Sequence, residues 1–320
     1  MLYYNKLLYY NIFMINRIQT YLLTLIFSVF FLTSTANADV KVVTSIKPIH
    51  SLVSYIMDGV GKPDVIVDGY NSPHGFSLKP SHAKMLENAD LVIWVGEDLE
   101  AFLEKPLKTI AKKAKNIEVM DLNGIKKLAF REKNIFEVHD DHKEKDGHEG
   151  LHHGEYDPHV WLDPMNAKVI IKEITKQLIK LDSTNSSVYK FNSKKALAEI
   201  EKLTKNIKKD LGKDLRFVVF HDAYQYFENR FGIQVFGALT VNTDVMPGAE
   251  QLSMIREVIE HEKVNCLFSE PQFNPSIIKS IAKDTNVKTG ILDPLGAALD
   301  KGKDLYFDLL KKMATSFKGC

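Results

Sequence analysis

Features typical of nucleic-acid-binding and nucleotide-binding proteins are missing from this 320-residue sequence. Its 42 basic residues are balanced by 41 acidic ones, a formal net charge of +1, and no stretch rich in lysine or arginine is interleaved with aromatics. Proteins that bind nucleic acid usually concentrate positive charge on one face. Neither a Walker A motif nor a G-x-G-x-x-G loop is present to bind phosphate. The composition argues against nucleic acid as the main partner and fits a globular protein long enough for two domains.

The apolar run near the N-terminus, residues 21–34, is short for a membrane span, which needs about 20 residues. Arg17 precedes it, and residues 36–38, Ala-Asn-Ala, have the small-x-small form that signal peptidase cleaves. We therefore expect a cleaved signal peptide and a mature chain that begins near Asp39. No cysteine stands at the cleavage site, so a lipid anchor is not expected. The alternative is a retained membrane anchor.

Cysteine is scarce, with Cys266 and Cys320 as the two in the sequence. In an exported protein an even pair allows one connectivity. Closing that loop would stabilise the fold by about 4 kcal/mol on the chain-entropy model. We expect this disulfide; the alternative is one buried thiol and one thiol at a frayed terminus.

Short β-branched runs alternate with amphipathic helical stretches after the apolar N-terminus. This alternation predicts strands followed by helices and mostly parallel sheets. The expected strands are residues 40–45, 64–69, 90–96 and 116–121 in a first series and 216–222, 233–239, 264–270 and 287–293 in a second. Between the series, residues 187–211 read as one helix, about 38 Å long at 1.5 Å per residue. The expected fold class is α/β, with two βα lobes bridged by one long rigid helix.

The chain is expected to divide into four parts, with a polar insertion inside the first lobe. They are a signal peptide at residues 1–38, a first lobe at 39–185, a linker helix at 186–211 and a second lobe at 212–320. Within the signal peptide, residues 1–13 are interpreted as an upstream extension or a misplaced start. The insertion, at about residues 122–156, breaks the alternation of strands and helices. A helix that Asp163 could cap and Pro164 could open follows it.

Four side chains lie where α/β sheets bind ligands, just beyond the C-terminal ends of strands. His74 is in the loop after strand 64–69, and His221 ends the run RFVVFH within strand 216–222. Asp293 ends the last strand, and His159 lies just before the helix that follows the insertion. Three imidazoles, with or without one carboxylate, suit zinc, whereas manganese usually requires more oxygen ligands. Taken singly, His74 could be a surface turn residue and His221 a hydrogen-bonded core residue.

The remaining histidines are weaker candidates. His50, His82 and His261 lie in expected helices and are interpreted as packing or surface residues. The insertion adds five more, His139, His142, His148, His152 and His153. Residues 148–152 match the zinc-protease pattern His-Glu-x-x-His, but glycines surround and interrupt it, and glycine destabilises the required helix. We expect a mobile, weak zinc-collecting loop; the alternative is a tolerated solvated insertion.

Several motifs in fixed order resemble a known family. They are NSPHGFSLKPS (71–81), DPHVWLDP (157–164), VVFHDAYQYFENRFG (218–232), LFSEPQFNPS (267–276) and TGILDPLG (289–296), and they follow an apparent signal peptide. Together they cover essentially the whole mature chain and resemble the zinc-specific solute-binding proteins of bacterial ABC importers, the ZnuA type. No single motif would be specific, but their order is.

The resemblance implies a periplasmic, non-enzymatic and monomeric protein that binds Zn²⁺ as transported ligand and passes it to an ABC permease in the inner membrane. It implies two βα lobes bridged by one helix, with His74 and His159 from the first lobe and His221 from the second around one ion in the cleft. A His-rich loop before the DPH motif and a cysteine pair are common in the family, as here. Related manganese binders have a glutamate at the position of His221.

One departure leaves the fourth ligand open. Some relatives carry an acidic residue immediately before the first histidine, where this chain has Pro73. Asp293, a water molecule or a residue of the loop could take that place. The rival functions are a manganese importer component or metal-dependent adhesin, and a zinc hydrolase, since three histidines and a water also resemble a hydrolytic site.

Overall fold

A computed structural model describes Met14 and residues 39–136, 154–211, 215–241, 243 and 247–320. The chain divides into two units, Met1–Asp39 and Val40–Cys320, and the architecture below is that of the second. The predicted signal peptide, apart from Met14, and the five histidines of the insertion lie outside the described residues. No helix in the described ranges has the length and apolar character needed to cross a membrane.

Two parallel four-stranded sheets form the centres of the two predicted lobes. The strands are β1 (Val42–Ile46), β2 (Asp64–Val67), β3 (Leu91–Trp94), β4 (Lys115–Glu118), β5 (Arg216–His221), β6 (Gln234–Thr240), β7 (Cys266–Ser269) and β8 (Lys288–Ile291). Their order is β2-β1-β3-β4 in one sheet and β6-β5-β7-β8 in the other, and every adjacent pair is parallel. The strand predictions are thus confirmed, and the same order repeats in both lobes.

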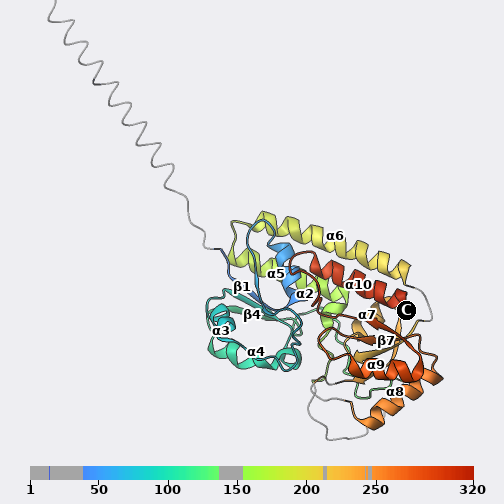
Figure 1. Ribbon diagram of the computed structural model, residues 1–320. Coiled ribbons are helices and arrows are strands. Elements are labelled where there is room, and N and C mark those ends of the chain that lie inside the picture. Colours follow the sequence, from blue (N-terminus) through green and yellow to red (C-terminus); the bar gives the residue numbers. More distant parts are fainter. Residues whose placement is uncertain (1–13, 15–38, 137–153, 212–214, 242, 244–246) are drawn as a thin grey trace, which may run out of the picture. The chain divides into compact units, whose positions relative to one another are not determined.

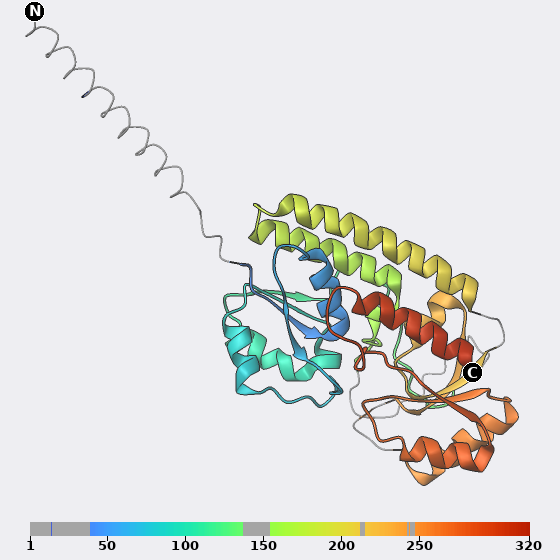
Figure 2. The ribbon, with the colours of Figure 1, turned by 45° about the horizontal axis from the view of Figure 1, so that its top comes forward.

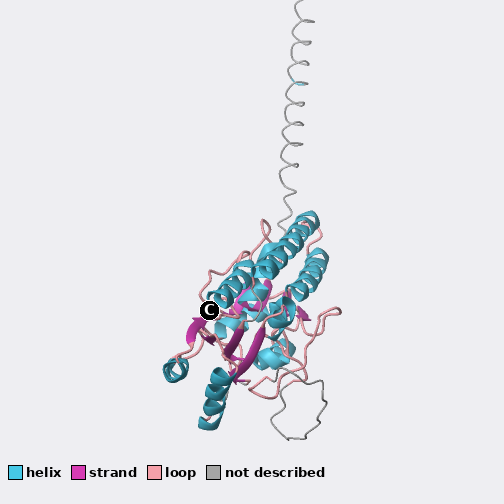
Figure 3. Cartoon of the chain, turned by 90° about the vertical axis from the view of Figure 1, so that its right-hand side faces the viewer, coloured by secondary structure: helices cyan, strands magenta, loops and turns pink. Residues whose placement is uncertain are grey.

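Helices flank the strands (Figure 3). They are α2 (Lys47–Ile56), α3 (Pro80–Glu87), α4 (Glu97–Thr109), the 3₁₀ turn η1 (Val160–Leu162), α5 (Pro164–Leu181), α6 (Ser186–Asp210), α7 (Gln225–Phe231), α8 (Ala249–His261), α9 (Ser276–Thr285) and α10 (Leu305–Gly319). The predicted start of α5 is confirmed, because the Asp163 side chain accepts a hydrogen bond from the Met165 N–H and Pro164 occupies the first turn.

The predicted long helix is α6, which has 25 residues. It lies beside α5 and runs across the fold from the first lobe to the second (Figures 1 and 2). It packs on α2, which follows β1, and on α10, which follows β8. Its buried residues, among them Tyr189, Ala196 and Ile200, join an apolar cluster that includes both β1 and β5. The helix therefore bridges the lobes through a shared core.

The predicted disulfide joins Cys266 at the start of β7 to Cys320 at the end of α10, with Cα atoms 5.6 Å apart. The prediction of this pairing is confirmed. Cys266 is fully buried and belongs to the same apolar cluster as the bridging helix. The bond therefore ties the C-terminal helix to the second sheet at the end of β7 opposite the loops that carry the candidate ligands.

Candidate metal site

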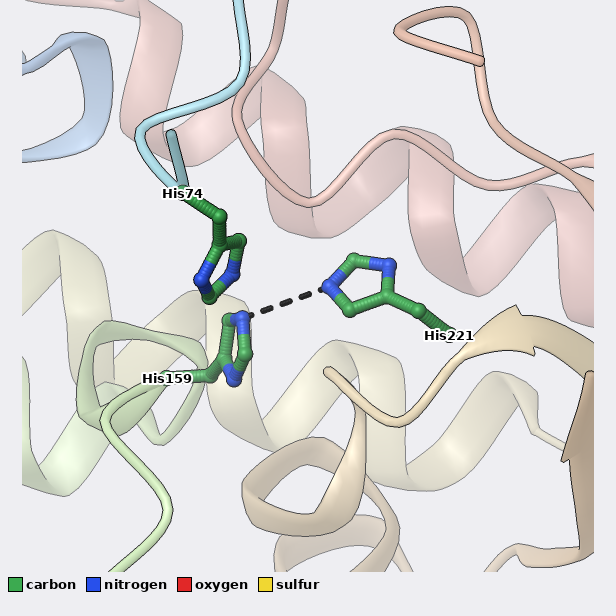
Figure 4. A group of neighbouring side chains, drawn as sticks. All are labelled: His74, His159 and His221. Carbon is green, nitrogen blue, oxygen red and sulfur yellow. Dashed lines mark hydrogen bonds between the residues drawn. The ribbon is translucent and has the colours of Figure 1, made fainter. Parts of the chain in front are cut away.

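Three of the four predicted side chains converge. His74 projects from the loop after β2, His159 immediately precedes η1, and His221 is the last residue of β5 (Figure 4). One nitrogen of each lies within 4.8 Å of the others. The Nε2 atoms of His159 and His221 are 3.4 Å apart. Two nitrogens bound to one tetrahedral zinc ion lie about 3.3 Å apart, so this spacing is already that of a zinc site.

His74 completes the triad from the first lobe. Its Nε2 is buried and has no hydrogen-bond partner within the described residues. Its ring centroid lies 5.6 Å from that of His159 and 5.9 Å from that of His221. A buried nitrogen without a partner is unfavourable unless something binds it, and a cation between the three rings would do so.

Two carboxylates orient two of the rings. The Nδ1 of His159 lies 2.7 Å from Oδ1 of Asp157, and the Nδ1 of His221 lies 2.6 Å from Oε1 of Glu270. When Nδ1–H donates to a carboxylate, the lone pair of Nε2 is left to face the centre of the triad. Both bonds therefore select the tautomer that binds a metal through Nε2.

Burial and the neighbouring carboxylates together set the pKa values of the triad. Desolvation, reinforced by the other imidazoles, holds the pKa of His74 well below its ordinary value, and the pKa of His159 is lowered for the same reasons. Burial also lowers the pKa of His221, but Glu270, Asp222 and Asp157 outweigh it and raise the pKa overall. Neutral imidazoles at His74 and His159 are ready to bind a cation near neutral pH.

On one side of the triad the walls of the site are largely apolar. Besides the triad and Glu270, the pocket is lined by Ser72, Pro73, Trp161, Gln272, Phe273, Pro294 and Leu295. Trp161 packs against His159 with ring centroids 5.2 Å apart, and its Nε1–H donates to the Pro294 carbonyl across the lobes. Such walls restrict water and strengthen electrostatic contacts within the pocket.

Asp293 is not part of the triad. Its carboxylate accepts hydrogen bonds from Gln272 Nε2 at 3.0 Å, from the Leu295 N–H at 3.3 Å and from the Ala298 N–H at 3.2 Å. Among the described residues, the group able to hold a metal consists of the three histidines. The carboxylate thus organises the turn after β8, and its predicted role as fourth ligand is not supported by a place in that group.

The other described histidines serve packing or lie at the surface, as expected. His50 is buried in α2, with Nε2 3.2 Å from the Pro63 carbonyl. The Nδ1 of His82 accepts from the Lys79 N–H at the start of α3, and His261 is exposed at the end of α8.

Asp157 and Glu270 are the functional residues that the sequence prediction missed. Glu270 directly follows β7, so the strand-end rule that selected His221 would also have selected it. Asp157 stands two residues before His159, close enough for its carboxylate to reach the ring. Neither residue type suggests a ligand-orienting role without the fold.

Comparisons with known proteins agree on one family. The family model described as zinc-uptake complex component A, periplasmic (ZnuA), matches residues 42–320. The high-affinity zinc uptake system protein ZnuA of Brucella abortus is 41% identical over 312 residues, covering 90% of this chain and 93% of that protein. Its counterpart from Yersinia pestis is 38% identical over 295 residues, covering 88% and 92%.

Solved structures show the same fold. A crystal structure of ZnuA superposes with a TM-score of 0.73 at 25% identity, covering 88% of this chain and 99% of that one. A mutant of the laminin-binding adhesin Lmb from Streptococcus agalactiae superposes with a TM-score of 0.72 at 25% identity, covering 87% and 98%. The predicted two-lobe architecture with a bridging helix is confirmed.

Proposed function

The chain belongs to the periplasmic zinc-uptake complex component A (ZnuA) family, and from this membership we propose that it captures Zn²⁺ between His74, His159 and His221 and delivers it to the permease of an ABC importer. The family is one of transport components, which agrees with the prediction that the protein is not an enzyme. Zinc is thus the transported substrate. The observation that carries the proposal is the 3.4 Å approach of the His159 and His221 Nε2 atoms beside the unpartnered Nε2 of His74.

The donor set favours zinc over manganese. Three imidazole donors suit zinc, whereas manganese prefers carboxylate and carbonyl oxygens. The carboxylate of Asp293, which would have added such an oxygen, already accepts three hydrogen bonds. We take the fourth position on the ion to be filled by water.

A competition titration tests the site. The purified protein is titrated with zinc, and separately with manganese, against a chromophoric chelator of known affinity. We expect one tight zinc site, weaker manganese binding, and a loss of zinc affinity of roughly 100-fold or more in His74→Ala, because even the partners of ligands are worth about 10- to 100-fold. His261→Ala, an exposed histidine at the end of α8, is the matched control. Tighter binding of manganese than of zinc would overturn the proposal.

We also propose that the chain is exported after cleavage near residue 38 and that the mature protein is a monomer. The support for cleavage is the apolar run at residues 21–34 and the Ala-Asn-Ala sequence that follows it. Mass spectrometry of the periplasmic fraction should give a mature chain that begins at Asp39. Recovery of the uncut chain with the membranes would contradict this proposal and favour a retained anchor.

For the five histidines of the insertion we propose weak, auxiliary zinc binding. The support is compositional, since closely spaced imidazoles and carboxylates bind zinc without a fixed geometry. Deleting residues 139–153 should lower the number of zinc ions held at high free zinc and leave the tight site unchanged. A deletion that removed the tight site would show that the loop supplies its fourth ligand.

A further inference from the structure

The described part of the insertion crosses between the lobes. We call residues Lys126–Phe136 the strap. At its start, the Lys126 N–H donates to Asn166 Oδ1 on α5, at 2.8 Å. At its end, the strap lies antiparallel to the edge strand β6, where the Phe136 N–H donates to the Phe236 carbonyl at 2.9 Å. The strap thus joins one lobe's insertion to the edge of the other lobe's sheet through a single antiparallel bridge.

The pairing on β6 requires a glycine. The Ala238 N–H donates to the Asn134 carbonyl at 2.8 Å, and Asn134 Nδ2 donates to the carbonyls of Ala238 and Leu239. A Cβ atom on Gly237 would lie 2.9 Å from that Asn134 carbonyl oxygen, closer than real Cβ atoms approach backbone. Substituting Gly237 therefore offers a way to displace the strap without touching a metal ligand.

Arg131 is the charged residue at the centre of the strap. Its guanidinium donates to Asp222 Oδ1 at 3.0 Å and to both carboxylate oxygens of Glu228 at 3.1 Å. It also lies over the ring of Phe136, 4.1 Å from the centroid. Both carboxylates are buried, and Asp222 is the residue next to the ligand His221. Without Arg131 these two buried carboxylates would lose their cationic partner, although Glu228 would keep the hydrogen bond from the Val235 N–H at 3.2 Å. Removing the cation from buried carboxylates is unfavourable.

The strap also supports the other buried ligand. The Leu128 carbonyl accepts from the Asp157 N–H at 2.9 Å, and the Leu128 N–H donates to the hydroxyl of Tyr226 at 3.0 Å. That hydroxyl in turn donates to the Asp157 carbonyl at 2.7 Å. Asp157 is the carboxylate that orients His159. One segment therefore holds the backbone beside both buried imidazoles.

We propose that Arg131 is a positioning residue of the metal site, which acts through the strap to fix the distance between His159 and His221. This inference rests on the proposed zinc function. When the Nε2 atoms of His159 and His221 already lie at the spacing of zinc ligands, the site needs no rearrangement to bind the ion. The ion should also dissociate slowly, because neither ring can move away from it alone. Loss of the strap should lower zinc affinity chiefly by speeding dissociation.

The test compares variants of the full protein. Arg131→Met removes the charge, Arg131→Lys retains it without the forked geometry, and Gly237→Ala and Asn134→Ala weaken the pairing on β6. Zinc affinity is measured by chelator competition, the dissociation rate by rapid mixing with excess chelator, and the Tm with and without zinc. Ile281→Val, in the separate apolar cluster of the second lobe, is the control for a general loss of stability.

We expect Arg131→Met and Gly237→Ala to lower zinc affinity at least about tenfold, mainly through faster dissociation, with partial recovery in Arg131→Lys. Ile281→Val should lower the Tm and leave zinc affinity unchanged. The inference is overturned if Arg131→Met, or Asn134→Ala where Arg131→Met fails to fold, lowers the Tm while affinity and dissociation rate stay at wild-type values. If the wild type itself bound no zinc, the proposed function would fail instead, so the two failures are distinct.

Discussion

Glu270 should raise the zinc affinity of the site although it lies outside the group of three donors. Its Oε1 is 2.6 Å from Nδ1 of His221, and its side chain is fully buried. Glu270→Gln keeps the shape and an oxygen that can accept from Nδ1–H but removes the charge. Hydrogen bonds to a charged group stabilise by about 1.5–3 kcal/mol and neutral ones by about 0.5–1.5 kcal/mol. The middles of these ranges differ by roughly 1.2 kcal/mol, which corresponds to about an eightfold loss of zinc affinity.

Glu270→Ala removes both the charge and the acceptor, so the ring of His221 loses its orientation as well. Its loss should approach roughly 100-fold, the upper range for partners that orient metal ligands. Both variants are measured by competition with a zinc chelator at neutral pH. Glu262→Gln, which changes a partly exposed carboxyl just after α8, is the control and should bind as wild type. If Glu270→Gln and Glu270→Ala both bound zinc within about twofold of wild type, the reasoning would be refuted.

Two further predictions concern stability. Cys320→Ser should lower the free energy of unfolding in urea by up to about 4 kcal/mol, because the disulfide no longer restricts the unfolded chain between two cysteines 54 positions apart. Zinc affinity should be retained. An unchanged unfolding midpoint would contradict this prediction. Glu100 is fully buried and accepts from the Val95 and Gly96 N–H groups, and burial raises its pKa to about 7. The native state then holds a proton that the unfolded chain has released, so stability falls as pH rises from about 4.5 to 7, by roughly 3 kcal/mol at most. Glu100→Gln should flatten this fall, and identical slopes for wild type and variant would refute the assignment.

The sequence located the donors because strand-end positions are readable from local pattern. His221 is at the end of one β-branched run, and His74 lies in the loop that follows another. In a parallel sheet the C-terminal ends of the strands lie at the same edge of the sheet. The same rule placed Asp293 at a strand end but could not say where its carboxylate points. Its orientation follows from the Gln272 side chain and from two backbone N–H groups in the turn after β8. The position of a residue at a strand end can be read from the local sequence, whereas the direction of its side chain also depends on contacts with other segments, here with Gln272.

The strap was not predictable for a related reason. Its mixed polar and apolar sequence has no strand or helix period, because only a few residues pair with β6 and their partners lie about a hundred positions further on. The sequence does not distinguish Arg131 from a surface arginine, because only the fold shows that it pairs with the buried side chains of Asp222 and Glu228. Gly237 likewise appears as an ordinary glycine in a strand. Residues that pair over such a long range have no local sequence pattern, so their role can be assigned only from the fold.

The connections between the lobes bear on how the ion can be released. The buried amine of Lys47 on α2 donates to the carbonyls of Ala297 and Leu299, beyond β8, and Arg230 on α7 forms a forked pair with Asp163 at the start of α5. A wide hinge motion would break these contacts together with the shared core of α6, whereas a local shift of one ligand loop would not. His159 and His221 are each held by a carboxylate, and the Nε2 of His74 has no partner in the described ranges. Of the three ligands, His74 is therefore the one that a movement of its loop can displace most easily.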